Sequence, residues 1–138
     1  MSFSPYLHFQ GNCAEAMQAY AKIFGAGDLT IMRYKEAPPN AQMQASDSDK
    51  VMHSQLTVGG QMLMASDYPA HMAGAPQAAV SINHSVSDLA RGQTVFDALA
   101  KGGDIIMPFG PTFFSKGFGM VKDRFGTHWM VMGPDNQA

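Results

Sequence analysis

Cysteine is nearly absent from this 138-residue chain, in which Cys13 is the only one. A domain of this length needs no disulfides, because it can bury roughly two-thirds of the surface that its unfolded chain exposes. The chain has a single cysteine, and its first residues lack the charged-then-apolar pattern of a leader. Both observations favour the reducing cytoplasm as its location. Cys13 lies in the first turn of an expected helix, and no motif places a histidine or asparagine around it. We therefore interpret it as a structural thiol rather than a nucleophile.

Strong charge of either sign is also missing. Nine basic and eleven acidic side chains leave a net charge of −2, and no run of Lys or Arg occurs. This excludes the basic surface with which proteins follow nucleic-acid phosphates. No apolar run approaches the roughly 20 residues that span a bilayer. The predicted partner is therefore a small molecule, with neither nucleic acid nor membrane involved.

Methionine and phenylalanine, by contrast, are abundant, with twelve and nine residues. Methionine fills irregular cavities without fixing their shape. Its abundance is typical either of a loosely packed core or of an adaptable ligand pocket, and the sequence leaves both interpretations open.

Two segments have the pattern of amphipathic helices, "QGNCAEAMQAYAKIFGAG" and "VSDLARGQTVFDALAKGGD". Asn12 and Asp88 are the expected N-caps, and Gly25 and Gly102 the expected ends. The two segments align when 76 is added to each residue number of the first, so that residue 12 aligns with residue 88. The matches are His8 with His84, Asn12 with Asp88, Tyr20 with Phe96 and Gly27 with Gly103.

Alternating apolar residues around the helices predict eight strands, near 3–10, 28–36, 51–58 and 61–66, then near 79–86, 104–110, 117–122 and 127–132. The pieces "GG" and "DRFG" are expected to join hairpins, and "EAPPNAQMQASDSDK" a longer loop. The last strands of the halves match at a shift of 66, from Met64 to Met130. The sequence thus predicts an α+β fold, a single domain of two βαβββ modules at about 1–68 and 77–134.

Three stretches resemble a known superfamily: "YLHFQGNCAEAMQAYAKIFGA", "HSQLTVGGQMLMASD" and "TFFSKGFGMVKDRFGTHWMV". They are similar to the vicinal oxygen chelate superfamily, which includes glyoxalase I and the bleomycin-resistance proteins, and more narrowly to its PhnB-like branch. The resemblance implies tandem βαβββ modules whose curved mixed sheet forms a cup around a small ligand. It also implies a homodimer. In metal-using members, four His, Gln or Glu side chains from the first and last strands of the modules hold a divalent ion.

Counting along the resembling motifs places the four ligand positions at Pro5, Met64, Ser81 and Met130. Proline has no donor atom, methionine offers a soft thioether, and serine is a weak ligand. The resemblance therefore implies a degenerate metal site, with no metal and no other cofactor predicted. A one-residue slip would turn each strand over, so His8, His53, His84 and His128 remain alternative nitrogen donors.

Seven residues are candidates for lining the ligand pocket: His53, Asn83, His128, Met64, Met130, Phe114 and Phe125. A neutral imidazole can bind a ligand oxygen or accept a proton near neutral pH. His8 and His84 are instead expected on the opposite face of their strands, packed against the helices. We interpret Asp67, in "ASDYP", as a turn residue.

Three functions remain open at this point. The chain is a metal-free small-molecule binder with a Met- and Phe-lined cup, a divalent-metal-dependent glyoxalase- or dioxygenase-like enzyme, or an assembly protein. PhnB-like proteins often carry a methyltransferase label. The glycine pieces "GAGD" and "KGGD" end helices rather than open them, so neither is typical of an S-adenosylmethionine loop.

Overall fold

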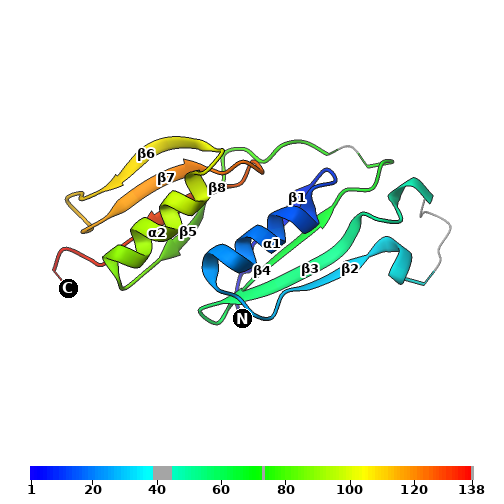
Figure 1. Ribbon diagram of the computed structural model, residues 1–138, viewed down its shortest axis with the longest axis horizontal. Coiled ribbons are helices and arrows are strands. Elements are labelled where there is room, and N and C mark those ends of the chain that lie inside the picture. Colours follow the sequence, from blue (N-terminus) through cyan, green and yellow to red (C-terminus); the bar gives the residue numbers. More distant parts are fainter. Residues whose placement is uncertain (39–44, 73, 138) are drawn as a thin grey trace. The chain divides into compact units, whose positions relative to one another are not determined.

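The computed structural model describes residues 1–38, 45–72 and 74–137, so part of the expected loop at 36–50 lies outside the described residues. The chain divides into two compact units, Met1–Pro76 and Gln77–Ala138. Both contain one helix and one four-stranded sheet (Figure 1).

The first unit follows the order strand, helix, three strands. Its elements are β1 (Tyr6–Phe9), α1 (Cys13–Phe24), β2 (Thr30–Arg33), β3 (Val51–Val58) and β4 (Gln61–Asp67), with 3-10 turns η1 (Tyr34–Glu36) and η2 (Ala45–Asp47) between β2 and β3. The sheet order is β1-β4-β3-β2. β1 runs parallel to β4, whereas the other pairs are antiparallel.

The second unit repeats this order. Its elements are β5 (Ile82–Ser85), α2 (Leu89–Ala100), β6 (Asp104–Gly110), β7 (Phe118–Lys122) and β8 (His128–Met132). The sheet order is β5-β8-β7-β6, with β5 parallel to β8. The predicted α+β fold, with a βαβββ order in each half, is confirmed.

Three of the predicted strands are shorter in the structure by several residues, and the last two each begin one residue later than predicted. The first and fifth shrink to four residues each, because β4 and β8 offer them parallel partners only over Met64–Asp67 and Trp129–Met132. The second ends at Arg33, where the chain enters η1. The hairpin at "GG" forms as predicted, since Gly59 and Gly60 adopt φ of +56° and +79°, which glycine reaches at little cost.

The two helices begin in different ways. As predicted, Asp88 caps α2, and its carboxylate accepts a hydrogen bond from the Ala90 amide at 3.1 Å. Asn12 precedes α1 but makes no side-chain cap. The carboxylate of Asp67, at the end of β4, accepts from the Cys13 amide at 3.0 Å instead. The prediction for Asn12 was right in position and wrong in mechanism.

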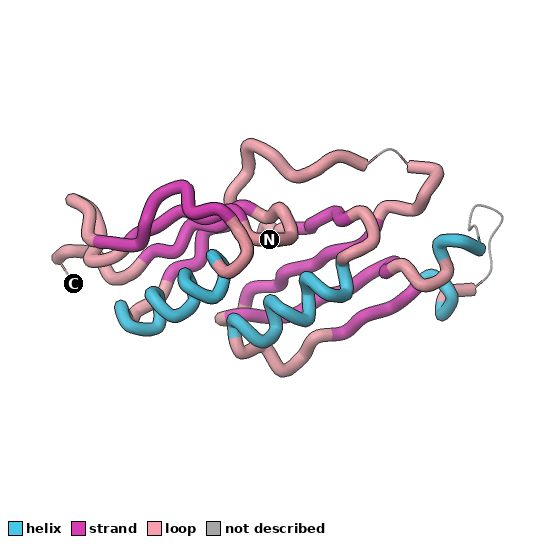
Figure 2. The backbone as a smooth tube through the Cα atoms, turned by 45° about the horizontal axis from the view of Figure 1, so that its top comes forward, coloured by secondary structure: helices cyan, strands magenta, loops and turns pink. Residues whose placement is uncertain are grey.

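Each helix lies along one face of its own sheet (Figure 2). In the first unit, Met17 and Tyr20 of α1 are buried, as are Phe9, Leu56 and Ala65 of the strands. In the second unit, the buried residues are Val95, Phe96 and Leu99 of α2 and Val121, Trp129 and Val131 of the strands. We call the face of each sheet opposite its own helix the open face. Among the described residues, neither helix is long and apolar enough to cross a membrane.

Candidate functional site

The open face of the first sheet carries polar and aromatic side chains. Along β1, Leu7 and Phe9 are buried on the helix side, so the exposed Tyr6 and His8 lie on the open face. Residues that are partners in neighbouring strands lie on the same face of the sheet. The strand residues on the open face therefore include Tyr6, His8, Met32, His53, Gln55 and Met64. None of these six residues is Asp, Glu, Lys or Arg.

Three of these side chains form one hydrogen-bonded chain. Tyr6 Oη lies 3.1 Å from His53 Nδ1, and His53 Nε2 lies 3.0 Å from Gln55 Oε1. An amide oxygen only accepts, so Nε2 carries the imidazole proton and donates it to Gln55. In the neutral form of the ring with this tautomer, Nδ1 accepts from the Tyr6 hydroxyl.

Aromatic rings extend this chain along β1. The His8 ring stacks on Tyr68, with centroids 4.6 Å apart and an interplanar angle of 11°. Tyr6 lies 5.1 Å from His8 and 5.7 Å from His53 between centroids. Four rings thus form a continuous row on the open face, a surface suited to a planar or apolar ligand.

His8 contradicts our expectation, because it lies on the open face and not under the helix. The reason is a difference between the halves. The helices superpose at a shift of 76, but the strands that precede them do not. Met64 and Met130 are the equivalent residues of β4 and β8. Tyr6 is the partner of Met64 and Asn83 is the partner of Met130, so the first strands of the two units align when 77 is added to the residue number. His84, as expected, lies on the helix side, where burial foremost and the Arg91 guanidinium lower its pKa.

The same register shows which residues lie beside two of the positions taken from the resemblance. Tyr6 lies opposite Met64 in the first sheet, and Asn83 lies opposite Met130 in the second. Tyr6 and Asn83, and not Pro5 and Ser81, are thus the partners of the two methionines. A phenol, an amide and two thioethers remain poor ligands for a hard divalent ion. Among the described residues, no group of three or more His, Cys, Asp or Glu side chains gathers at one place.

The open face of the second sheet is rich in methionine. Asn83, Met130 and Met120 are consecutive partners across three strands, and His128 lies opposite Lys122 on the same face. Phe114, 38% exposed, packs edge-on against Phe118 at 5.1 Å between centroids. Phe125 lies in the β7–β8 turn, where the Arg124 guanidinium stands 4.3 Å from its ring centroid.

The seven predicted pocket residues thus divide between two units. His53 and Met64 lie on the first open face; Asn83, His128 and Met130 lie on the second. The prediction did not include Tyr6, Gln55 and Tyr68. For Gln55 a signal existed, because it is two residues from His53 in an alternating strand and must share its face.

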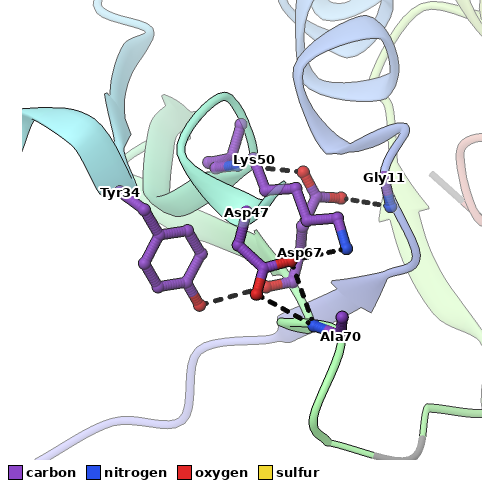
Figure 3. Close-up of polar contacts among 7 residues, drawn as sticks. Gly11, Tyr34, Asp47, Lys50, Asp67 and Ala70 are labelled. Atoms are coloured by element: carbon purple, nitrogen blue, oxygen red, sulfur yellow. Dashed lines mark hydrogen bonds and ion pairs between the residues drawn. The ribbon is translucent and has the colours of Figure 1, made fainter. Parts of the chain in front are cut away.

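Asp67 is a structural carboxylate (Figure 3). It is 2% exposed, and it accepts hydrogen bonds from the amides of Gly11 at 2.8 Å, Cys13 at 3.0 Å and Val51 at 3.0 Å. It joins β4 to the β1–α1 connection and to the start of β3. The interpretation of Asp67 as a turn residue was wrong, because Asp67 ends β4 and its carboxylate accepts hydrogen bonds from residues distant in the sequence.

Cys13 is fully buried, and burial raises the pKa of its thiol to about 12. Its Sγ lies 3.5 Å from Ser54 Oγ. At neutral pH the thiol therefore stays protonated and inert, as the sequence predicts.

A second carboxylate, Asp47, supports a testable pH dependence. It is 1% exposed, and its Oδ1 lies 2.9 Å from the Lys50 ammonium, which holds the pKa of the carboxyl below its usual 3.8 (Figure 3). A lowered pKa stabilises the fold above the unfolded value, and this contribution is lost as the pH falls through the folded value. We expect Asp47→Asn to lower the urea midpoint at pH 7, with the difference from wild type shrinking below about pH 4.

Asp49→Asn is the matched control for that measurement, because Asp49 pairs with Lys35 at 2.8 Å with its side chain 82% exposed. Water and salt screen such a pair, so its effect on the midpoint should be smaller at every pH. Equal effects of the two substitutions would refute the role assigned to Asp47.

Comparison with known proteins places this geometry in a family. The sequence model of the family described as 3-demethylubiquinone-9 3-methyltransferase matches residues 1–132. Protein YjdN of Escherichia coli K12 is 34% identical over 140 residues, which cover 95% of this chain and 94% of that protein.

Solved structures agree. Protein PA1353 from Pseudomonas aeruginosa superposes with a TM-score of 0.87 at 40% identity, over 96% of this chain and 97% of that one. A PhnB protein from Bacillus cereus, described as a putative 3-demethylubiquinone-9 3-methyltransferase, gives 0.73 at 29% identity, over 97% and 100%. A glyoxylase/bleomycin resistance protein/dioxygenase domain from Frankia sp. EAN1pec shares the fold, with a TM-score of 0.65 at 11% identity, over 96% and 95%. The chain therefore belongs to the PhnB-like family, described by its sequence model as 3-demethylubiquinone-9 3-methyltransferase.

Proposed function

We propose that this protein binds a small molecule on the open faces of its sheets, without a hard divalent ion at the positions that metal-using relatives employ. The observation that carries the proposal is the chain Tyr6–His53–Gln55, with its hydrogen bonds of 3.1 and 3.0 Å. It is a polar anchor on a face that no helix of its own unit covers. Beside it, the ligand position assigned to Met64 and the partner of that residue, Tyr6, offer only a thioether and a phenol.

The surroundings of this anchor indicate the kind of ligand. Tyr6, His8, Met32, His53, Gln55 and Met64 of the first open face include no Asp, Glu, Lys or Arg, and the rings of Tyr6, His8 and Tyr68 form an aromatic row. Binding sites for small molecules combine such apolar walls with a few placed polar groups. We infer a planar ligand of low charge that carries at least one hydrogen-bonding oxygen, placed against the rings with its oxygen at Tyr6 or His53.

The same anchor has the parts of an acid–base pair. A neutral imidazole oriented by Gln55 can accept a proton at Nδ1, and the Tyr6 hydroxyl is within reach to deliver one. The sequence model of the family is described as a methyltransferase. Methyl transfer would require S-adenosylmethionine, and no feature of the Tyr6–His53–Gln55 site favours that molecule.

The test is a ligand panel read by two independent methods. Wild-type protein is mixed with catechol, S-adenosylmethionine, Zn²⁺, Ni²⁺ or Mn²⁺, and each probe is followed by thermal shift and by NMR of ¹³C-methyl methionine. We expect catechol to move the signal of Met64 or Met32, which share the face of His53. Loss of one ligand hydrogen bond should weaken binding about tenfold in Tyr6→Phe.

Tyr68→Phe is the matched control, because it removes a hydroxyl from the same aromatic row but lies outside the Tyr6–His53–Gln55 chain. It should bind catechol as wild type does. Stoichiometric binding of a divalent ion that His53→Ala abolishes would favour the metal-dependent enzyme, and binding of S-adenosylmethionine would favour the methyltransferase. Catechol shifts confined to Met17, on the helix side, would refute the assigned face.

Two further points belong to the proposal. We infer a homodimer, and light scattering during size-exclusion chromatography will measure its mass. We also infer that residues 1–68 and 77–134 are the two modules of one domain. The cytoplasmic location suggested by the single cysteine remains a prediction.

A further inference from the structure

Three methionines form a row across the open face of the second sheet. Met107 on β6 is the partner of Met120 on β7, with a register irregularity on each side of Met107, and Met120 is the partner of Met130 on β8. Residues directly opposite each other in antiparallel strands share one face. The alternate residues Val121 and Trp129 are buried, on the side where α2 packs. The three thioethers therefore lie on the side away from the helix.

The spacing lets these side chains meet. Opposite residues in antiparallel pairs have Cβ atoms about 5 Å apart, and neighbouring strands repeat at about 4.8 Å. Methionine is unbranched, with three rotatable bonds, so the outer two side chains can fold over the middle strand. Met107 is 43% exposed, and the other two are half-buried, so the row remains accessible.

Two further donors lie beside the row. Asn83 is the partner of Met130 on β5, and His128 precedes Met130 by two residues on the same face. An imidazole is a good ligand for borderline and soft metals, and an amide oxygen is a weaker one. Lys122 faces His128 from β7, and Asp104 is its partner on β6, so one positive and one negative residue flank the row.

We propose that Met107, Met120 and Met130 form a site for a soft monovalent cation, namely Cu(I), with His128 as a fourth donor. Thioethers select Cu(I) and leave hard divalent ions to oxygen ligands. A thioether also needs no deprotonation, unlike a thiol or an imidazolium, so binding by these three ligands displaces no proton. The site is independent of the ligand proposed for the first open face, since it uses residues of the other unit.

The experiment uses Ag(I), a redox-inert stand-in for Cu(I), added as nitrate to ¹³C-methyl methionine protein. We expect the Met107, Met120 and Met130 signals to move together and to saturate near one equivalent, whereas Zn²⁺ leaves them in place. Met120→Leu should lower the affinity at least about tenfold, the usual scale for disturbing a metal site. Met62→Leu, on a strand of the other unit, should bind Ag(I) as wild type does. Cu(I) affinity is then measured by competition with a chromogenic chelator under anaerobic conditions.

The thiol of Cys13 is another soft ligand that could bind Ag(I). Two further measurements distinguish binding at Cys13 from binding at the methionine row. Silver bound to that thiol would perturb Met17, one helical turn away on α1, and binding would disappear in Cys13→Ala. That outcome overturns the proposal, as does unchanged Ag(I) affinity in Met120→Leu. The unfolding midpoint from Trp129 fluorescence shows whether Met120→Leu is folded. If Cys13→Ala does not fold, the wild-type titration still separates the sites, because the Met17 and Met120 signals belong to different units.

Discussion

Asp67→Ala is expected to unfold α1 and β1 selectively, with a loss of about 4 kcal/mol or more in the free energy of unfolding. The carboxylate accepts three backbone hydrogen bonds, from Gly11, Cys13 and Val51, while it is 2% exposed. Hydrogen bonds to a charged group contribute about 1.5–3 kcal/mol each, and a buried amide without an acceptor adds its desolvation cost. Such a loss is a large part of the stability of a small protein, which is about 5–15 kcal/mol in total.

The measurement should distinguish the two units. The only tryptophan, Trp129, lies in the second unit, so its fluorescence does not report on α1. Amide hydrogen exchange across Cys13–Phe24 is the appropriate readout. Asp88→Ala is the matched control, because Asp88 caps the other helix by accepting a hydrogen bond from the Ala90 amide. It should cost about 1 kcal/mol. Equal losses in the two variants would show that Asp67 is an ordinary helix cap.

The second large effect is expected at Gly103, which precedes β6. A Cβ added there would overlap the carbonyl oxygen of Lys122 and lie 2.9 Å from the Asp123 Cα. These are backbone atoms at the start of the β7–β8 turn, which cannot move aside as a flexible side chain would. Gly103→Ala should therefore destabilise the second unit by about 3 kcal/mol, near the upper range for overpacking.

Gly27 provides the control, because it occupies the same place after α1 that Gly103 occupies after α2. A Cβ at Gly27 meets nothing within 4 Å, and its φ is not in the left-handed region. Gly27→Ala should be neutral, or stabilising by about 0.5 kcal/mol, because alanine reduces the entropy of the unfolded chain. Urea unfolding, followed by Trp129 fluorescence for Gly103→Ala and by far-ultraviolet circular dichroism for both, measures the effects. A Gly103→Ala protein as stable as wild type would contradict the steric argument.

Much of the fold could be predicted from local patterns. Alternation of apolar residues and paired glycines predicted β3 and β6 with their observed bounds and the turn between β3 and β4. Both helices were placed within one or two residues. These features depend on side chains close together in the sequence, which is the information that periodicity contains.

The candidate site was harder to predict, because it depends on which face each strand presents. The face of β1 is set by its pairing with β4, more than fifty residues away. The repeat suggested that His8 matches His84, but the chain between β1 and α1 is one residue longer than its counterpart. This difference reversed the assignment of His8 and left Tyr6 unrecognised. The acceptor at the start of α1 was missed for a similar reason, since Asp67 reaches it from the end of β4.

That single extra residue between Phe9 and Cys13 has an evolutionary consequence. β1 is an edge strand, held on one side only by β4. Deleting one codon in the connection, with α1 kept in place, would pull the strand forward by one position. Leu7 and Phe9 would then occupy the open face, and Tyr6 and His8 would turn beneath the helix. One such deletion changes several ligand-facing residues together, so relatives with this fold can diverge in ligand chemistry through changes in loop length as well as through substitutions.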